Sequence, residues 1–161
     1  VRKFMLFNAH GGQMNAMDIV IRDLREKHGL MAVAAHWYML GLPPGLFSEH
    51  ELAHGIHAGE LETSVMLALK PRDVHMDKAK AFGSLTETLA EENRFLSITR
   101  SGKLGWQAQD LNPEGACGDA TRATAEKGRA VLDFVSDRFV ELLTEVHRFD
   151  LKRLDNEPAW R

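Results

Sequence analysis

The apolar residues near the start of the chain form two unbroken runs, at positions 4–7 and 30–35. Neither run alternates with polar residues, which is typical of parallel strands covered on both faces. Between the runs, the apolar positions of residues 14–24 recur at helical spacing, and Gly29 is a helix stop signal. The pattern therefore predicts a strand, a helix and a second strand in one right-handed βαβ unit.

Further along the chain, loop and helical patterns alternate. Residues 41–59 are rich in glycine and proline and predict a loop, whereas residues 60–69 predict a helix that ends before Pro71. The pattern next predicts a helix at 84–94 and a short strand near 95–99. An amphipathic stripe over 120–146 predicts a final helix capped by Asp119, which we expect to pack across the sheet. The polar tail from about residue 149 is expected to fray.

Length and composition are those of a single domain without unusual charge. The chain has 161 residues, with 20 Lys and Arg against 23 Asp and Glu. This balance gives no electrostatic reason to expect nucleic acid or an anionic membrane as a partner. No apolar run approaches the ~18 residues of a membrane span. The single cysteine excludes an internal disulfide. We therefore expect one domain over residues 1–161, located in the cytoplasm.

The first candidate site is the segment N-A-H-G-G-Q at positions 8–13, directly after the first predicted strand. His10 stands at the carboxyl end of that strand, where α/β proteins place their chemistry. Gly11 and Gly12 allow the backbone to approach a ligand closely. A histidine at a strand end also serves as an ordinary structural residue, so this segment alone leaves both interpretations open. The GxGxxG spacing of dinucleotide-binding loops is absent.

The second candidate site is the segment H-A-G-E-L-E-T-S at positions 57–64. It combines His57 with two carboxylates, Glu60 and Glu62, in the first turn of the predicted helix. A carboxylate can bind a divalent metal, and a nearby imidazole can transfer protons. Glutamates in a first helical turn also complement the helix dipole. A structural role is therefore the more common explanation for this segment taken by itself.

Residues 50–54 read H-E-L-A-H and match the zinc-protease motif HExxH, in which two histidines bind zinc and the glutamate is a general base. Ser48 and Glu51 have the spacing of a capping box, so a short helix is expected here. Prolines just upstream and Gly55 just downstream confine that helix, whereas zinc proteases use a long packed one. We therefore expect no metal on His50 and His54.

Taken together, segments 8–13 and 57–64 resemble the paired signatures of the creatininase family, N-G-H-G-G-N and H-A-G-x-x-E-T-S. Their order and separation agree with that family, as do V-M-L-A-L at 65–69, Trp37 and the stretch 118–128. The resemblance covers most of residues 4–147. It implies an α/β fold, a three-layer α/β/α sandwich with a mostly parallel sheet. It also implies a metal-dependent amidohydrolase that hydrolyses non-peptide C–N bonds of the cyclic amide or formamide type.

The resemblance also implies roles for individual residues. His10 and Glu62 match metal ligands, and His57 matches the catalytic proton shuttle. Four further positions match the surroundings of the substrate: Asn8, Gly11, Gly12 and Trp37. The implied cofactor is a pair of divalent ions, Zn, Mn or Fe, and the implied partners are a small-molecule amide substrate and further copies of the chain, commonly in a hexamer. We expect His10 and Glu62 to converge on one cleft.

The chain departs from the family pattern in three ways. The other family ligands, a Glu, a His and a bridging Asp, belong to an E-x-H-G…D segment that this chain lacks. We therefore expect an N-terminal portion of the fold to be missing, and the 161-residue chain alone to be inactive. Gly12 and Ala53 stand where creatininase itself carries a Glu and a lid Trp, which argues against creatinine as the substrate. Gln13 replaces an Asn but keeps the amide.

Two other functions stay open at this point. A chain without a complete set of metal ligands is also expected of a non-catalytic fragment or a pseudoenzyme. The zinc-protease interpretation is less favoured, and the position of the metal separates it from the others. Metal on His50 and His54 indicates a protease, whereas metal on His10 and Glu62 indicates an amidohydrolase.

Overall fold

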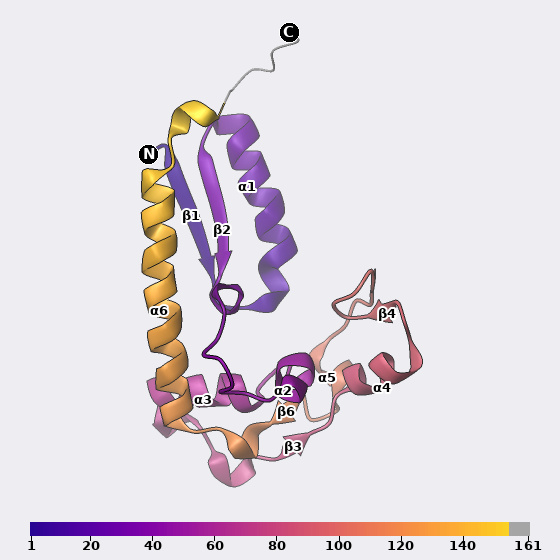
Figure 1. Cartoon of the computed structure of the whole chain (residues 1–161). Helices are drawn as coiled ribbons and strands as arrows, with labels where there is room; N and C mark the ends of the chain where they lie inside the picture. The colour runs from indigo at the N-terminus through magenta and orange to yellow at the C-terminus, as the bar shows by residue number, and fades with distance from the viewer. Residues whose placement is uncertain (155–161) are drawn as a thin grey trace. The chain divides into compact units, whose positions relative to one another are not determined.

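The computed structural model describes residues 1–154, which fall into two compact units. The first unit comprises Val1–Leu42 and the residues from Phe134 on, and the second comprises Pro43–Asp133. Figure 1 shows the elements of both units, coloured by residue number. Helix α6 (Ala125–Arg148) contributes its first turns to the second unit and the remainder to the first.

The first unit is built on a βαβ element, which is joined by short 3-10 helices and the later part of α6. Its elements are β1 Lys3–Asn8, η1 Gly11–Gln13, α1 Met14–His28, β2 Met31–His36, η2 Trp37–Leu40, the later part of α6, and η6 Leu151–Arg153. The two strands are parallel and paired over their whole length, so both end at the same edge. Gly29 ends α1 with a left-handed φ of 64°, which favours glycine. The predicted βαβ unit is confirmed.

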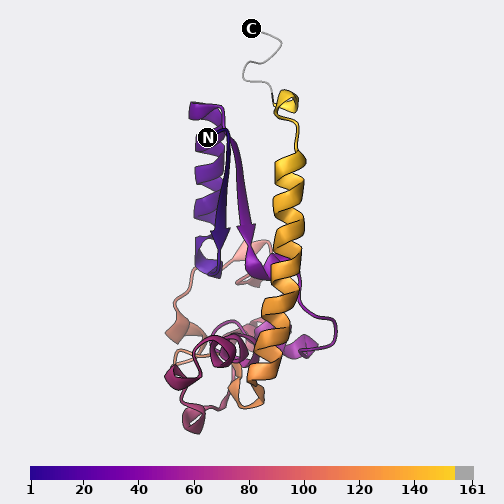
Figure 2. The ribbon, with the colours of Figure 1, turned by 90° about the vertical axis from the view of Figure 1, so that its left-hand side faces the viewer.

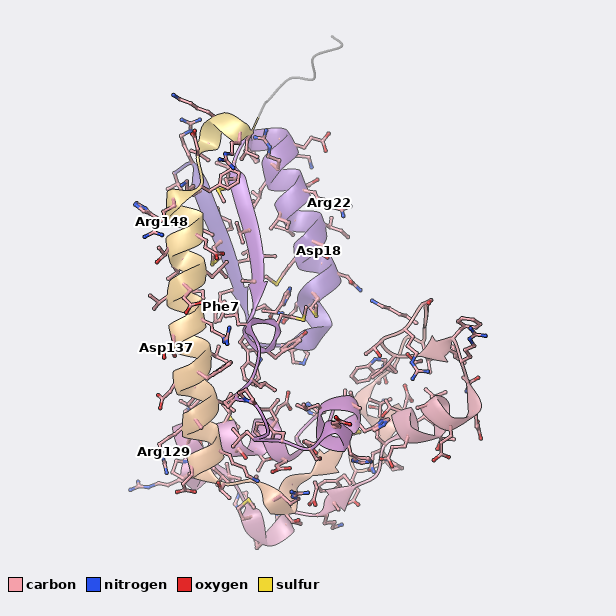
Figure 3. The ribbon with its side chains drawn as sticks, viewed as in Figure 1. Phe7, Asp18, Arg22, Arg129, Asp137 and Arg148 are labelled. Carbon is pink, nitrogen blue, oxygen red and sulfur yellow. The ribbon has the colours of Figure 1, made fainter. Side chains whose placement is uncertain are left out.

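Helices cover both faces of the strand pair in this unit. In Figures 1 and 2, α1 lies along one side of β1 and β2, and the later part of α6 lies along the other. Phe7 of β1 packs on Phe139 of α6 with ring centroids 4.2 Å apart, whereas Asp18 and Arg22 of α1 point away from the strands (Figure 3). The Lys3 ammonium donates to two carbonyl oxygens in the last turn of α6 and to that of Phe149 just after it. This is the three-layer α/β/α arrangement that the resemblance implies.

The second unit consists of short helices and two-residue strands. Its elements are α2 Glu49–His54, α3 Glu60–Leu69, η3 Pro71–Asp73, η4 Met76–Lys78, β3 Ala81–Phe82, α4 Leu85–Glu92, β4 Leu96–Ser97, β5 Gly102–Lys103, α5 Ala108–Leu111, β6 Gly118–Asp119, η5 Ala120–Arg122 and the first turns of α6. β3 pairs with β6 in antiparallel fashion, and β4 with β5 in parallel. The helix predicted at 60–69 is α3, and the strand predicted near 95–99 is β4.

Helices α3 and α6 meet at Gly128 without room for a side chain. A Cβ built at Gly128 would overlap the carbonyl oxygen of Ser64. The Ser64 hydroxyl is fully buried, donates to the Glu60 carbonyl at 2.6 Å and accepts the Thr124 N–H at 3.1 Å. Val131, further along α6, is also fully buried. The first turns of α6 are thus fixed against α3.

Two sequence predictions at the ends of α6 are corrected by the structure. Asp119 caps η5, where its carboxylate accepts the Thr121 N–H at 3.1 Å, and α6 begins only at Ala125. Residues 118–119 pair with β3, so the long helix cannot start there. The tail that the sequence predicts to fray forms η6 as far as Arg153, and residues 155–161 lie outside the described part. No helix in that described part is long and apolar enough to cross a membrane.

Candidate functional site

The 8–13 segment turns sharply at the end of β1, and Asn8 holds this turn. Asn8 is buried, and its amide nitrogen donates to the His10 carbonyl and lies 2.9 Å from the His36 ring. The side-chain oxygen of Asn8 accepts the His10 N–H at 3.1 Å. The amide of Asn8 is therefore occupied inside the protein, where it fixes the turn that presents His10. His36, at the end of β2, is not among the residues that sequence reasoning singled out.

Gly12 leaves room for the His10 ring. A Cβ at Gly12 would stand 3.0 Å from His10 Cε1, so a larger residue has to displace the imidazole. The Gly12 N–H donates to His10 Nδ1 at 3.3 Å, and His10 itself is exposed. Gly11 lies beside the Tyr38 hydroxyl, and the Trp37 ring meets the Tyr38 ring edge-on. His10, both glycines and Trp37 thus lie at one edge of the β1–β2 pair.

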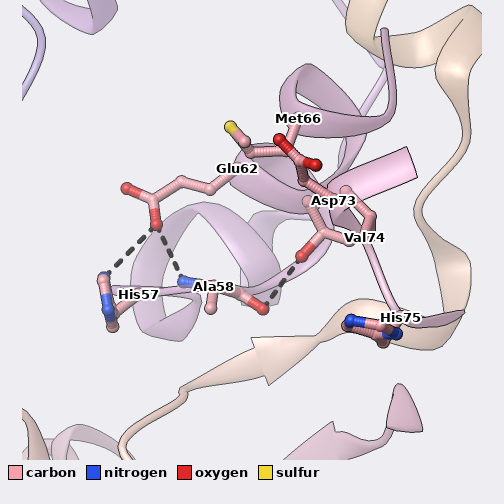
Figure 4. Close-up of a pocket in the computed structure, with 8 residues that line it drawn as sticks. His57, Ala58, Glu62, Met66, Asp73, Val74 and His75 are labelled. Carbon is pink, nitrogen blue, oxygen red and sulfur yellow. Dashed lines mark hydrogen bonds and ion pairs between the residues drawn. The ribbon is translucent and has the colours of Figure 1, made fainter. Parts of the chain in front are cut away.

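The 57–64 segment is a tight turn into α3 that holds His57 next to Glu62. Glu62 Oε2 accepts the Ala58 N–H at 2.8 Å and lies 3.4 Å from His57 Nδ1 (Figure 4). Ala58 has a φ of 54°, a left-handed conformation that costs a non-glycine residue about 1 kcal/mol or more. The Thr63 hydroxyl donates to the Ala58 carbonyl, and the Cys117 N–H donates to the His57 carbonyl. These hydrogen bonds hold the strained turn in place.

The paired side chains are open to a ligand. The His57 and Glu62 side chains are 46% and 41% exposed. No donor among the described residues reaches Glu62 Oε1, so one carboxylate oxygen is available. Carboxylate oxygen and imidazole nitrogen are the ligand types of Zn, Mn and Fe sites. The donor types therefore fit a divalent metal, although residues 1–154 contain no group of three or more His, Cys, Asp or Glu that could hold an ion.

The His57–Glu62 pair lines a pocket of about 350 Å³ together with Ala58 and Thr63. A second wall comes from the next turn of α3 and from the segment that follows it. This wall consists of Met66, Asp73, Val74 and His75 (Figure 4). The volume falls in the range of small-molecule sites. Sequence reasoning cited Met66 only as part of the V-M-L-A-L stretch, and it missed the other three residues because no motif marks them.

The two candidate segments belong to different units of the structure. His10 lies in the first unit, whereas His57 and Glu62 lie in the second. Within its own unit, each segment presents an exposed imidazole beside a fixed turn. The convergence of His10 and Glu62 on one cleft stays a prediction.

The glutamate of the H-E-L-A-H segment is enclosed by backbone. Glu51 is only 4% exposed, its Oε2 accepts the Asp119 N–H at 3.1 Å, and its Oε1 lies 3.4 Å from the Leu61 nitrogen. A Cβ at any of three glycines would overlap or crowd this carboxylate: Gly55, Gly59 and Gly118. Glu51 is therefore a structural residue of the second unit. Its carboxylate is not free to act as a general base on a water molecule.

The two histidines of the same segment have separate partners. His54 Nδ1 pairs with Thr86 Oγ1 at 2.9 Å, and His50 Nε2 lies 3.5 Å from the Glu87 carboxylate. The two imidazole centroids are 5.1 Å apart. Helix α2 ends with His54 and is capped by Ser48, as the sequence predicts. This is not the long helix with a free glutamate that a zinc protease uses.

Replacing His50 with alanine is therefore expected to leave the metal content of the purified protein unchanged. His50 contacts an exposed carboxylate, and its loss removes no ligand from the 8–13 or 57–64 segments. Elemental analysis of the purified wild type and variant checks this. A clear drop in metal for His50→Ala would revive the zinc-protease interpretation.

The single cysteine serves structure and not nucleophilic catalysis. Cys117 is 1% exposed, and burial raises the pKa of its thiol, so the reactive thiolate is disfavoured. Its backbone pairs with His57 in an isolated β-bridge. The chemistry available at the pocket therefore comes from carboxylates and imidazoles.

Comparison with known proteins places the chain in a family. Residues 1–143 match the model of the creatininase family, described as creatinine amidohydrolase. The chain belongs to this family. The resemblance that the two signature segments carry is thereby confirmed, and so is the creatininase-like α/β fold.

Individual relatives extend this assignment. The chain is 30% identical over 131 residues to the mycofactocin precursor peptide peptidase of Mycobacterium ulcerans (strain Agy99), covering 80% of this chain and 43% of the relative. It is 28% identical to a putative creatinine amidohydrolase from Bacteroides fragilis NCTC 9343, with a TM-score of 0.72, covering 93% of this chain and 56% of that one. A Zn-Zn form of a creatininase mutant shares the fold at 21% identity, with a TM-score of 0.62, covering 90% of this chain and 56% of that one. The chain thus spans less than half the length of the curated relatives.

Proposed function

We propose that this chain supplies part of the catalytic site of a metal-dependent amidohydrolase that hydrolyses a C–N bond. The observation that carries the proposal is the His57–Glu62 pair on the wall of a pocket, in a turn fixed by hydrogen bonds on both sides. Family membership and the Zn-Zn and Mn forms of solved creatininases support the metal dependence. The bond that we propose first is a non-peptide one, in a cyclic amide or a formamide.

A second candidate is an amide bond within a peptide. The relative with 30% identity is named a mycofactocin precursor peptide peptidase. The pocket is half open at His57 and Glu62, so a longer chain could extend beyond it. The two candidates share the same residues and differ only in what is attached to the reacting amide.

His57 is the proton-transferring residue of the proposed reaction. Glu62 Oε2 is placed to accept a hydrogen bond from His57 Nδ1, which fixes the ring and leaves Nε2 to exchange a proton with the departing nitrogen. The Ala58 N–H holds the same carboxylate oxygen, so Glu62 cannot swing away without breaking two contacts. Glu62 therefore fixes the orientation of the His57 ring, and the free nitrogen of that ring can transfer a proton.

His10 and Glu62 are the proposed metal ligands of this chain, with Zn, Mn or Fe as the ions. When bound, such an ion lowers the pKa of a coordinated water molecule and so supplies the hydrolytic nucleophile. A tetrahedral site needs about four ligands, so two residues cannot complete it. We propose that residues outside this chain's 161 supply the others, and that the chain by itself is inactive.

The substitution Glu62→Gln tests this function. Because the neutral amide holds a cation poorly, we expect metal affinity to fall, and amide hydrolysis to fall with it. The protein should be purified from its own cells through a tag on this chain, so that whatever completes the site is retained. Metal content and hydrolysis of formamides, cyclic amides and short peptides are then measured.

Glu91→Gln is the matched control, because Glu91 is an exposed carboxylate of α4 outside the pocket. It should change neither metal content nor turnover. Full metal occupancy in Glu62→Gln would remove Glu62 from the ligand set. Metal-loaded wild-type protein without any amide hydrolysis would instead favour the non-catalytic alternative.

A further inference from the structure

The second wall of the pocket is built by the turn that follows α3. Glu62 and Met66 are four residues apart in α3, so they lie on one face of the helix, and Ala58 lines the pocket from the turn before it. The chain then leaves α3 at Lys70 and turns through η3, where the Val74 N–H donates to the Pro71 carbonyl. This turn brings residues 73–75 back to the pocket, with Asp73 and Val74 nearer to Met66 than His75 is (Figure 4).

The chemistry of this wall is apolar with one carboxylate. Met66 and Val74 supply apolar surface, and Asp73 supplies a negative charge. Within the described residues, no hydrogen bond or ion pair is made by the Asp73 carboxylate. The hydrogen bonds of η3 are made by backbone groups. The lining contains no lysine or arginine. Glu62 is a proposed metal ligand and lies against His57, so the free charge on this wall is that of Asp73. This charge favours a cationic ligand over an anionic one.

We propose that Met66, Asp73 and Val74 form a recognition subsite that takes an apolar group bearing a protonated amine. Its role as the subsite next to the reacting amide rests on the proposed function, because His57 and Glu62 line the same pocket. The apolar part of the ligand covers Met66 and Val74, and its ammonium group faces Asp73. A pocket of about 350 Å³ is large enough for a group of this kind.

Three probes of the same shape and different charge test the subsite without any metal or catalysis: isopentylamine, isopentanol and isovalerate. They are titrated into the full chain, and the Met66 methyl resonance is followed by NMR with isotope-labelled methionine. We expect the amine to shift this resonance in a saturable way, and isovalerate to bind most weakly. Salt should weaken the amine and leave the alcohol unchanged, because only the charge pair is screened.

The substitution Asp73→Asn isolates the charge. For an exposed ion pair, we expect the amine to lose about two- to fivefold in affinity, while the alcohol binds as before. Unchanged binding of the alcohol also shows that the pocket has kept its shape. Asp77→Asn is the matched control, because Asp77 is an exposed aspartate of η4 outside the pocket lining.

The outcomes separate this inference from the proposed function. Amine binding that is insensitive to Asp73→Asn, or equal binding of isovalerate, overturns the subsite and leaves the roles of His57 and Glu62 untouched. Charge-dependent binding at Met66 supports the subsite, and a lack of amide hydrolysis by metal-loaded protein purified from its own cells then counts against the catalytic proposal alone. An equal loss in Asp73→Asn and Asp77→Asn shows a general charge effect and also overturns the subsite.

Discussion

Gly128→Ala is expected to destabilise the protein by about 3 kcal/mol or more, or to prevent the second unit from folding. The new Cβ would overlap the Ser64 carbonyl oxygen, and backbone cannot rotate away as a side chain can. Helix propensity alone predicts the opposite sign, since alanine stabilises a helix interior by about 1 kcal/mol relative to glycine. The sign of the effect is therefore diagnostic of close packing between α3 and α6.

Urea and thermal unfolding of the wild type and variant measure this effect. Ser136→Ala is the matched control, because it places an alanine on an exposed position of the same helix. The control should be neutral or slightly stabilising. A Gly128→Ala protein as stable as the wild type, or more stable, would show that α3 and α6 do not meet as closely as the structure has them.

His57→Asn is expected to lower amide turnover by a factor of about 10² to 10⁴, the usual contribution of a positioned proton-transfer group. Asparagine keeps an N–H that can reach Glu62 Oε2, which preserves the turn before α3. It cannot take up and return a proton near neutral pH. We therefore expect kcat to collapse while KM and metal content change little, in contrast to Glu62→Gln.

The measurement requires the protein in the assembly in which the wild type is active. His28→Asn serves as the control, because His28 is an exposed residue in the last turn of α1. Joint loss of metal and turnover in His57→Asn would make His57 a metal ligand and not a proton shuttle. Undiminished turnover would mean that another group transfers the proton.

The βαβ unit could be predicted because its signals are local. Unbroken apolar runs mark β1 and β2, and Gly29 marks the end of α1 through its left-handed backbone. The start of α6 could not be predicted in this way. Asp119 has the same local pattern whether it caps a long helix or a 3-10 turn, and only the pairing of β6 with β3 decides between them.

The candidate site likewise contains residues that local sequence signals mark and residues that only the tertiary structure brings together. His57 and Glu62 are five positions apart in one signature, so sequence could pair them, and the structure places them 3.4 Å apart. Asp73 and Val74 reach the pocket only through the turn after α3, which carries no motif. Likewise, nothing in the sequence connects Asn8 with His36, since their contact depends on the register of β1 and β2.

The enclosure of the Glu51 carboxylate by three glycines has an evolutionary consequence. A methyl group at any one of those glycines collides with a carboxylate that already holds the backbone of Asp119, so no single enlargement is tolerated. Replacing Glu51 with the shorter aspartate, without other changes, leaves the buried N–H groups of Asp119 and Leu61 without an acceptor, which is costly. Among homologues, these four sites should covary as one block. The match of residues 50–54 to a protease motif is therefore coincidental, because Glu51 serves to hold the surrounding backbone.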